Sequence, residues 1–150
     1  MSLAGQLDES RVVVGLRART KEEALRAVAK LFAKGHAGID ADRAYSEMQE
    51  REEVAQTGIG DGLALPHGKA EGIKKPIHVL VVSAEGIEWD SADGKPVHIV
   101  AATLAPEKSA ADPVKLLARF ARIFKDEGLR RRLAEAKTAA QAIEALRSAD

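Results

Sequence analysis

The chain has 150 residues, of which 45% are apolar and only 3% aromatic, so it is long enough to bury one largely aliphatic core. Its 23 basic and 23 acidic side chains balance, which argues against a nucleic-acid-binding protein with a broad basic face, and the absence of cysteine excludes a disulfide scaffold and a thiolate metal site. The chain shows no signal peptide and no apolar run long enough to span a bilayer. We therefore expect one domain, residues 1–150, in a soluble cytoplasmic protein without membrane insertion.

One strand and two helices are predicted in the first third of the chain. Residues 11–16 form a short β-branched run that is typical of a strand. Thr20 and Glu23 form a capping box at the start of an amphipathic helix, and Gly35 is placed to end that helix. Asp40 is a suitable N-cap for a second helix.

The second helix carries an arginine on its apolar stripe. Ala44, Met48, Arg51 and Ala55 fall on one side of the helix, so Arg51 continues a face that is otherwise apolar. The side chain could lie along the surface with its stem packed. It could instead direct its guanidinium at an anion beside the segment that follows. The helical pattern leaves both interpretations open.

The second helix leads into TGIGDGLALPHGK, residues 57–69, which we expect to be a glycine-rich loop. A nucleotide-binding loop needs four residues between its first glycine and its Gly-Lys pair, followed by a hydroxyl side chain. Here five residues separate Gly62 from Gly68, and Ala70 stands where the hydroxyl is required. Leu63 occupies the place of the third glycine of a dinucleotide-binding turn. Both nucleotide interpretations therefore fit poorly.

His67 is the candidate reactive residue of this stretch. A neutral imidazole nitrogen can attack phosphorus and form a covalent intermediate, and glycines let backbone N–H groups approach the phosphoryl oxygens. Pro66 stiffens the approach to His67, and Arg51 would supply a bidentate positive charge if it reaches the loop. The alternative is a tight turn that joins a helix to a strand and exposes a histidine. The residues by themselves do not decide between these two hypotheses.

The second half of the chain predicts two buried strands followed by three helices. Residues 76–83 and 97–104 are continuous apolar runs, with a turn at residues 93–94 between them. Pro113, preceded by Asp112, is placed to open an apolar helix, and Gly128 is expected to interrupt the chain before two short final helices. With strands in the middle and helices at both ends, the chain is predicted to be one α/β layered domain.

A metal site is not expected from the histidines. The chain holds His36, His67, His78 and His98, which have no paired ligand spacing and no thiolate partner. His78 and His98 fall within the patterns of buried strands, where a structural role is the commoner one. His36 follows the glycine that ends the first helix, so we expect it to be solvated.

Residues 50–69, EREEVAQTGIGDGLALPHGK, resemble the fructose/mannitol-type IIA component of the bacterial phosphoenolpyruvate-dependent sugar phosphotransferase system. The nitrogen-regulatory IIA proteins belong to the same family. An arginine, a Thr-Gly-Ile-Gly-x-Gly run and Pro-His-Gly, in that order, carry the resemblance, and GIEWDSADGKPVHIV and APEK extend it. It covers about residues 11–146. The resemblance implies a mixed β-sheet flanked by helices on both faces.

The resemblance also implies a function for the motif residues. His67 would accept a phosphoryl group from the phosphocarrier protein HPr and pass it to a IIB component, and Arg51 would help to hold the phosphoryl oxygens. The chain would then be an enzyme component of the phosphotransferase system that needs no cofactor. The alternative is a regulatory module without sugar transport, whose binding to a target protein depends on phosphorylation. The phosphoryl-binding loop would comprise Thr57, Gly58, Ile59, Gly60, Gly62 and Pro66.

One position departs from the family pattern. Members usually have a second histidine near the start of the helix after the last strand, close to the active one. Here Pro113 takes that place, and no histidine follows His98. Lys115 is the nearest cation in the sequence and is the candidate substitute. The missing histidine is also the one feature that would fit a relative that no longer takes phosphate.

Overall fold

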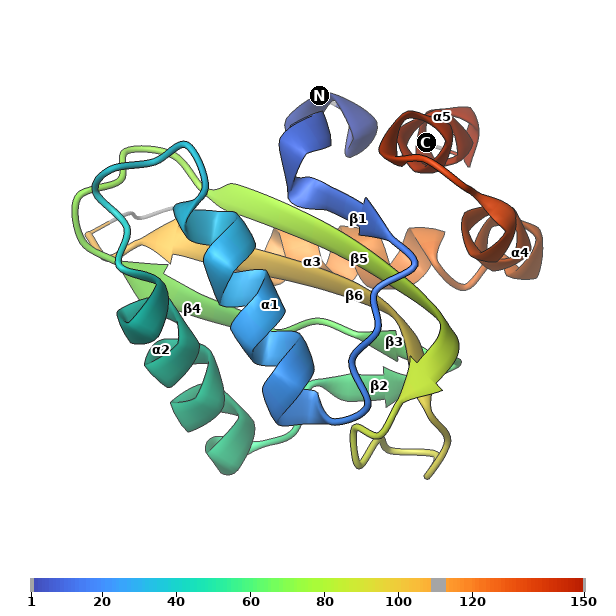
Figure 1. Cartoon of the computed structure of the whole chain (residues 1–150), viewed down its shortest axis with the longest axis horizontal. Coiled ribbons are helices and arrows are strands. Elements are labelled where there is room, and N and C mark those ends of the chain that lie inside the picture. Colours follow the sequence, from blue (N-terminus) through green and yellow to red (C-terminus); the bar gives the residue numbers. More distant parts are fainter. Residues whose placement is uncertain (1, 109–112, 150) are drawn as a thin grey trace.

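A computed structural model of the chain describes residues 2–108 and 113–149, and within these ranges one open β-sheet carries helices on both faces (Figure 1). This is the α/β domain with a mixed sheet that was predicted. Two short 3₁₀ turns, Ala4–Gln6 and Glu9–Arg11, precede the first strand. Asp112, which was expected to help cap a helix, lies outside the described residues.

The sheet has the strand order β1-β5-β6-β3-β2, and β4 also pairs with β6. The two long strands, β5 and β6, are antiparallel neighbours at its centre. Strand β1 runs parallel to β5, β3 and β4 run parallel to β6, and β2 is antiparallel to β3. Long apolar runs in β5 and β6 are buried because helices cover both of their faces. The strands are β1 (Val12–Val14), β2 (Gly58–Gly60), β3 (Leu63–Ala64), β4 (His67–Ala70), β5 (Ile77–Ile87) and β6 (Val97–Pro106).

Two separate cores lie on the two faces of the sheet. Helices α1 (Lys21–Ala33) and α2 (Ala41–Val54) pack against one face, in front of the sheet in Figure 1. Helices α3 (Pro113–Ile123), α4 (Glu127–Glu135) and α5 (Ala139–Ala149) cover the other face together with the N-terminal segment. Both cores are mainly aliphatic, as the low aromatic content predicted.

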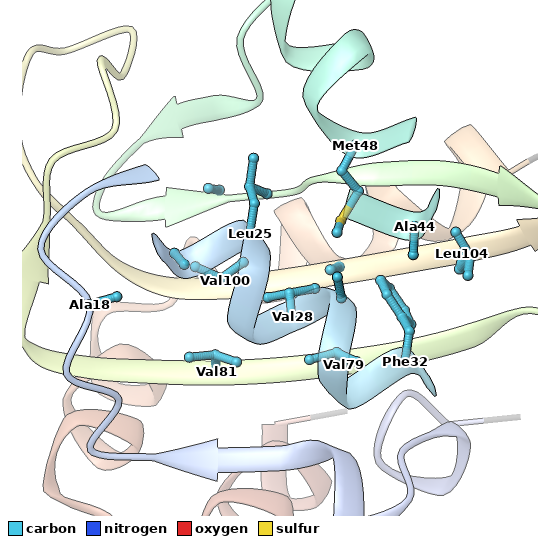
Figure 2. Close-up of a cluster of buried hydrophobic side chains, with 14 of the residues drawn as sticks. Ala18, Leu25, Val28, Phe32, Ala44, Met48, Val79, Val81, Val100 and Leu104 are labelled. Carbon is cyan, nitrogen blue, oxygen red and sulfur yellow. The ribbon is translucent and has the colours of Figure 1, made fainter. Parts of the chain in front are cut away.

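The core under α1 follows from the predicted amphipathic pattern. Leu25, Val28 and Phe32 recur at helical spacing and are all buried. In Figure 2 they point from α1 toward the valines of β5 and β6, with Met48 and Ala44 of α2 beside them. Burial of large side chains of this kind contributes roughly 1.5–3 kcal/mol each to folding. The pair α1 and α2 is therefore fixed firmly on the sheet.

The helix signals in the sequence are confirmed with one exception. The Thr20 hydroxyl accepts from the Glu23 N–H at the start of α1, Gly35 has a positive φ just after that helix, and Asp40 caps α2. The expected break at Gly128 is wrong. Gly128 lies in the first turn of α4, where its N–H donates to the capping side chain of Asp126. A cap of this strength starts a helix despite the low helix propensity of glycine.

The expected glycine-rich loop is also wrong in its simplest form, because the stretch folds into the three short strands β2, β3 and β4. Strands β3 and β4 both pair with β6 in parallel and in the same register, Leu63 opposite Ile99 and His67 opposite Thr103. They therefore act as one strand that is interrupted between Ala64 and His67.

Candidate active site

The interruption at Leu65 and Pro66 sets the position of His67. Pro66 has no N–H to donate, but its carbonyl accepts from the Thr103 N–H of β6 at 3.1 Å. The Leu65 N–H donates to the carbonyl of Thr57 at 3.1 Å, away from β6. His67 is consequently the first residue after the break, half-buried at the start of β4.

The hydrogen bonds of His67 define its tautomer. The ring nitrogen Nδ1 lies 3.1 Å from the Leu65 carbonyl oxygen. A carbonyl can only accept, so Nδ1 carries the hydrogen and Nε2 keeps its lone pair. Arg51 donates its Nε–H to that Nε2 atom at 3.1 Å. The ring nitrogen of His67 that keeps a lone pair is therefore Nε2, and the guanidinium of Arg51 lies directly beside it.

Arg51 comes from the last turn of α2 and is held from a second side. Its Nη1 donates to the carbonyl of Ala55 at 2.8 Å, so the fork bridges the helix end and the histidine. Of the two interpretations of this arginine, the structure matches the one directed at the following segment. The predicted stripe needs a correction, because the buried positions of α2 are Ala44, Met48 and Glu52, whereas Ala55 is exposed.

Only part of the predicted phosphoryl-binding loop lies near His67. The carbonyl of Thr57 bonds Leu65, so Thr57 and Pro66 adjoin the histidine. Gly58 is next to this point, opposite Ala64 of β3. The N–H and hydroxyl of Thr57 are both directed at Glu52, so they do not face the ring.

The other loop glycines shape the far end of a hairpin. Gly60 and Gly62 have φ angles of 99° and 76° and turn β2 back into β3. Asp61 between them donates its N–H to Asp93 at 3.1 Å, and the Gly62 carbonyl accepts from His98. His67 is the fifth residue after Gly62 along an extended path, which corresponds to roughly 16 Å. Ile59, the middle residue of β2, is 48% exposed.

His78 lies in the same cross-strand row as His67, since Thr103 of β6 pairs with both residues. It is 5% exposed, its Nδ1 is 3.0 Å from the Thr103 hydroxyl, and its ring meets that of Phe120 edge-on. Burial lowers the pKa of His78 from 6.5 to about 4, because the charged form would lose its hydration. His78 is thus the buried structural histidine that the strand pattern predicted.

The two remaining histidines, His98 and His36, lie in half-buried positions. His98 is half-buried and bonds the Ser83 carbonyl through Nδ1 at 2.9 Å. His36 is half-buried, with Nδ1 covered, rather than solvated as expected. Among the residues that the structure describes, no three His, Asp or Glu side chains are grouped to hold a metal ion. None of the described helices is both long and apolar enough to cross a membrane.

The place of the missing histidine is at the start of α3. That helix begins at Pro113, as predicted, and Lys115 is exposed in its first turn. Across residues 2–108 and 113–149, no hydrogen bond or ion pair joins Lys115 to His67 or Arg51. The structure therefore adds no contact in support of Lys115 as a substitute.

Sequence reasoning missed Glu52, an acid that is buried next to this site. Its carboxylate is 3.3 Å from Lys21 Nζ and accepts from Thr57. A signal was present in the sequence, since Glu52 stands four residues after Met48 and eight after Ala44, on the buried stripe. Its partner Lys21 is thirty-one positions earlier, too far for a local pattern to pair them.

Comparison with known proteins identifies the family. The family model described as "Phosphoenolpyruvate-dependent sugar phosphotransferase system, EIIA 2" matches residues 6–149. The chain is 34% identical over 119 residues to the fructose-specific EIIA component of Haloferax volcanii, covering 79% of this chain and 77% of that protein. It is 33% identical over 132 residues to a nitrogen regulatory protein of Bradyrhizobium diazoefficiens, covering 88% and 85%.

Solved structures agree on the fold. Nitrogen regulatory protein IIA-Ntr from Neisseria meningitidis superposes with a TM-score of 0.86 at 23% identity, over 96% of this chain and 98% of that one. Enzyme IIAMTL from Escherichia coli, in its complex with phosphorylated enzyme IIBMTL, gives a TM-score of 0.79 at 23% identity, over 95% and 97%.

Proposed function

The chain belongs to the EIIA 2 family of the phosphoenolpyruvate-dependent sugar phosphotransferase system and is a phosphoryl carrier, and from this premise we propose that His67 carries the phosphoryl group on Nε2. The observation that supports the assignment most directly is the pair of bonds on the imidazole. The Leu65 carbonyl accepts from Nδ1–H, and Arg51 donates to the lone pair of Nε2. The nitrogen that can attack phosphorus thus has a guanidinium beside it.

The transfer step needs no proton movement on this chain. The Nε2 lone pair of His67 forms the new bond to phosphorus. The bond from phosphorus to the donor protein breaks, and its electron pair leaves on the donor atom. Positive charge that develops on the imidazole is stabilised by the Leu65 carbonyl at Nδ1–H. Arg51, displaced from Nε2, then donates its fork to the phosphoryl oxygens.

The proposed partners are proteins. An HPr-type phosphocarrier supplies the phosphoryl group, and a IIB component or a regulatory target receives it or recognises it. Two large apolar side chains are exposed in the segments that carry the site residues, Val54 in the last turn of α2 with 82% exposure and Ile59 of β2 with 48% exposure. Exposed apolar groups beside a reacting side chain are typical of surfaces that bind proteins transiently. On this proposal the protein is a phosphotransferase-system enzyme component of the cytoplasm.

A regulatory role uses the same phosphohistidine. The similarity to a nitrogen regulatory protein is as extensive as that to a fructose-specific component, so it supports a phosphorylated state that serves as a signal as much as one that serves as a step in sugar uptake. Transfer from His67 to a IIB protein would distinguish the transport role. A target that binds only one of the two phosphorylation states would distinguish the regulatory role.

The experiment that tests the assignment is phosphorylation in a defined mixture. The protein is incubated with phosphoenolpyruvate, enzyme I and HPr, and its intact mass is read in alkaline buffer, where phosphohistidine survives. We expect the mass of one added phosphoryl group in the wild type and in the control His36→Ala, and none in His67→Ala. Label at the wild-type level in His67→Ala would show that another residue carries the group.

A further inference from the structure

Glu52 is a buried carboxylate at the end of α2 with no place in the transfer step described above. Its side chain is 4% exposed and lies 3.3 Å from Lys21 Nζ at the start of α1. Both carboxylate oxygens are 3.1 Å from the Thr57 backbone nitrogen, and the Thr57 hydroxyl also bonds to Glu52. Desolvating a carboxylate is costly, and these donors compensate it.

The bonds of Glu52 form part of a closed circuit around the reactive histidine. Thr57, held by Glu52 through its N–H and hydroxyl, accepts at its carbonyl from Leu65 at 3.1 Å. Leu65 accepts in turn from Nδ1–H of His67 at 3.1 Å. Nε2 of that ring accepts from Arg51 at 3.1 Å, and Arg51 is covalently joined to Glu52. Within the described residues, both groups that bond the imidazole are therefore connected to this carboxylate.

These bonds span the short connection between α2 and β2. Between the end of α2 and the start of β2 the chain passes through Ala55 and Gln56, of which Ala55 is exposed and accepts from Arg51. Glu52 thus fastens the last helical turn, which carries the guanidinium, directly to Thr57, which carries the Leu65 contact. An apolar side chain could fill the same space without the desolvation cost, but it could not bond Thr57.

We propose that Glu52 is a positioning residue for phosphoryl transfer. Its carboxylate fixes Thr57 and, through the Leu65 carbonyl, keeps His67 in the Nδ1–H tautomer with Nε2 facing Arg51. Lys21 balances the buried charge, with its Nζ 3.3 Å from the carboxylate. The inference rests on the proposed function of His67. It predicts that Glu52 changes the chemical step and the tautomer of His67 rather than the binding of the donor protein.

The test compares Glu52→Gln and Thr57→Val with the wild type, using HPr phosphorylated by enzyme I and phosphoenolpyruvate as donor. Glutamine keeps the shape and one acceptor but loses the charge, and valine removes only the hydroxyl. We expect kcat to fall about tenfold to a hundredfold, the range that small misplacements of reacting groups produce. The KM for the donor should stay within about twofold, since no group that contacts the donor changes. In nitrogen-15 NMR spectra, the Nε2–H tautomer of His67 should gain population in both variants.

Two controls separate positioning from stability. Leu133→Ala removes a buried side chain of α4 on the other face of the sheet, so it lowers thermal stability without touching the circuit. Its folded form should transfer at the wild-type rate, and Thr57→Ser, which keeps both donors, should restore most of the activity that Thr57→Val loses. If Glu52→Gln does not fold, the kcat and the His67 tautomer ratio of Thr57→Val decide the test.

The result that would overturn the inference is a wild-type kcat and an unchanged tautomer ratio in Thr57→Val and in folded Glu52→Gln, with reduced thermal stability alone. Failure of the proposed function would look different. In that case wild-type His67 would take no phosphoryl group from the donor mixture, whereas the tautomer measurement on the unphosphorylated protein would still report whether Glu52 controls the ring.

Discussion

The segment from Thr57 to His67 folds back on itself, so that both of its chain ends lie together. At this His67 end the Thr57 carbonyl bonds Leu65, whose own carbonyl bonds the ring of the histidine; at the opposite, hairpin end, Gly60 and Gly62 make a turn against Asp93. The two ends look alike in sequence, because both are rich in glycine. They differ in what the backbone is bonded to. The bonds of Thr57 and His67 lead to charged side chains of α1 and α2, whereas those of Gly58 and of the hairpin end lead to the connection between β5 and β6. If His67 carries the phosphoryl group as proposed, the chemistry depends on α2 and the hairpin serves as scaffold.

The largest expected effect at the His67 end, short of removing the histidine, comes from Arg51. Arg51→Ala should slow transfer from phosphorylated HPr by about 10²- to 10³-fold, since a preorganised donor to the phosphoryl oxygens is lost. Arg51→Lys should remain poor, because an ammonium lacks the planar fork that reaches Nε2 and the Ala55 carbonyl together. Single-turnover rates and circular dichroism would be recorded in parallel. A normal rate in folded Arg51→Ala would remove the arginine from the site.

His67 and His78 flank Thr103 of β6 from its two sides, but only His78 is buried. His78 has its pKa lowered to about 4 by burial, whereas its usual value of 6.5 applies in the unfolded chain. Between these pH values the unfolded chain binds the extra proton, so stability falls as pH drops from 6.5 toward 4 and this contribution levels off below that. The loss amounts to about 3 kcal/mol from this group.

Urea titrations at several pH values would measure how the free energy of unfolding changes with pH between 6.5 and 4. His78→Phe should reduce the pH dependence of the unfolding free energy between pH 6.5 and 4, whereas His36→Ala should leave most of this dependence unchanged. An equal slope in His78→Phe and the wild type would show that other groups account for the acid sensitivity.

Gly58 and Gly62 provide a direct comparison of the two ends. A Cβ at Gly58 would lie 2.5 Å from Ser91 Oγ and 2.8 Å from Trp89 Cδ1, so Gly58→Ala is overpacked and should cost roughly 1–3 kcal/mol. Gly62→Ala has more space, 3.4 Å to His98, but must adopt a φ of 76°, at a cost of about 1 kcal/mol. Thermal melts and transfer rates would be measured on both. Folded Gly58→Ala should transfer more slowly, and folded Gly62→Ala normally. Equal rates would contradict the division of the segment into a reactive end and a scaffold end.

The parts of the fold that the sequence predicted are those with local causes. The cap of α1 at Thr20 and the end of that helix at Gly35 depend on neighbouring residues, so they could be read directly. Strands β2 to β4 could not, because β3 and β4 form by pairing with β6, which is distant in the sequence, and β2 pairs in turn with β3. Within the site, the motif placed Arg51 and His67 together. Glu52 escaped notice, because its burial depends on Lys21 from another helix.

The smallest expected effect concerns Lys115, the proposed substitute for the missing second histidine. Its side chain is exposed at the start of α3, so its charge acts through water and is screened by salt. If it assists the phosphoryl group, Lys115→Ala should lower the transfer rate by only about two- to threefold at low ionic strength, which is the worth of an exposed charge. The effect should vanish in high salt. Adding Pro113→His to Lys115→Ala should raise the transfer rate at any salt concentration, because an imidazole there would donate a hydrogen bond, which salt does not screen as it screens a distant charge. Lys125→Ala, which removes a lysine that is also exposed just beyond the other end of α3, is the matched control. Equal low-salt rates in Lys115→Ala and Lys125→Ala would show that Lys115 is merely solvated, and Arg51 would then be the cation on which transfer depends.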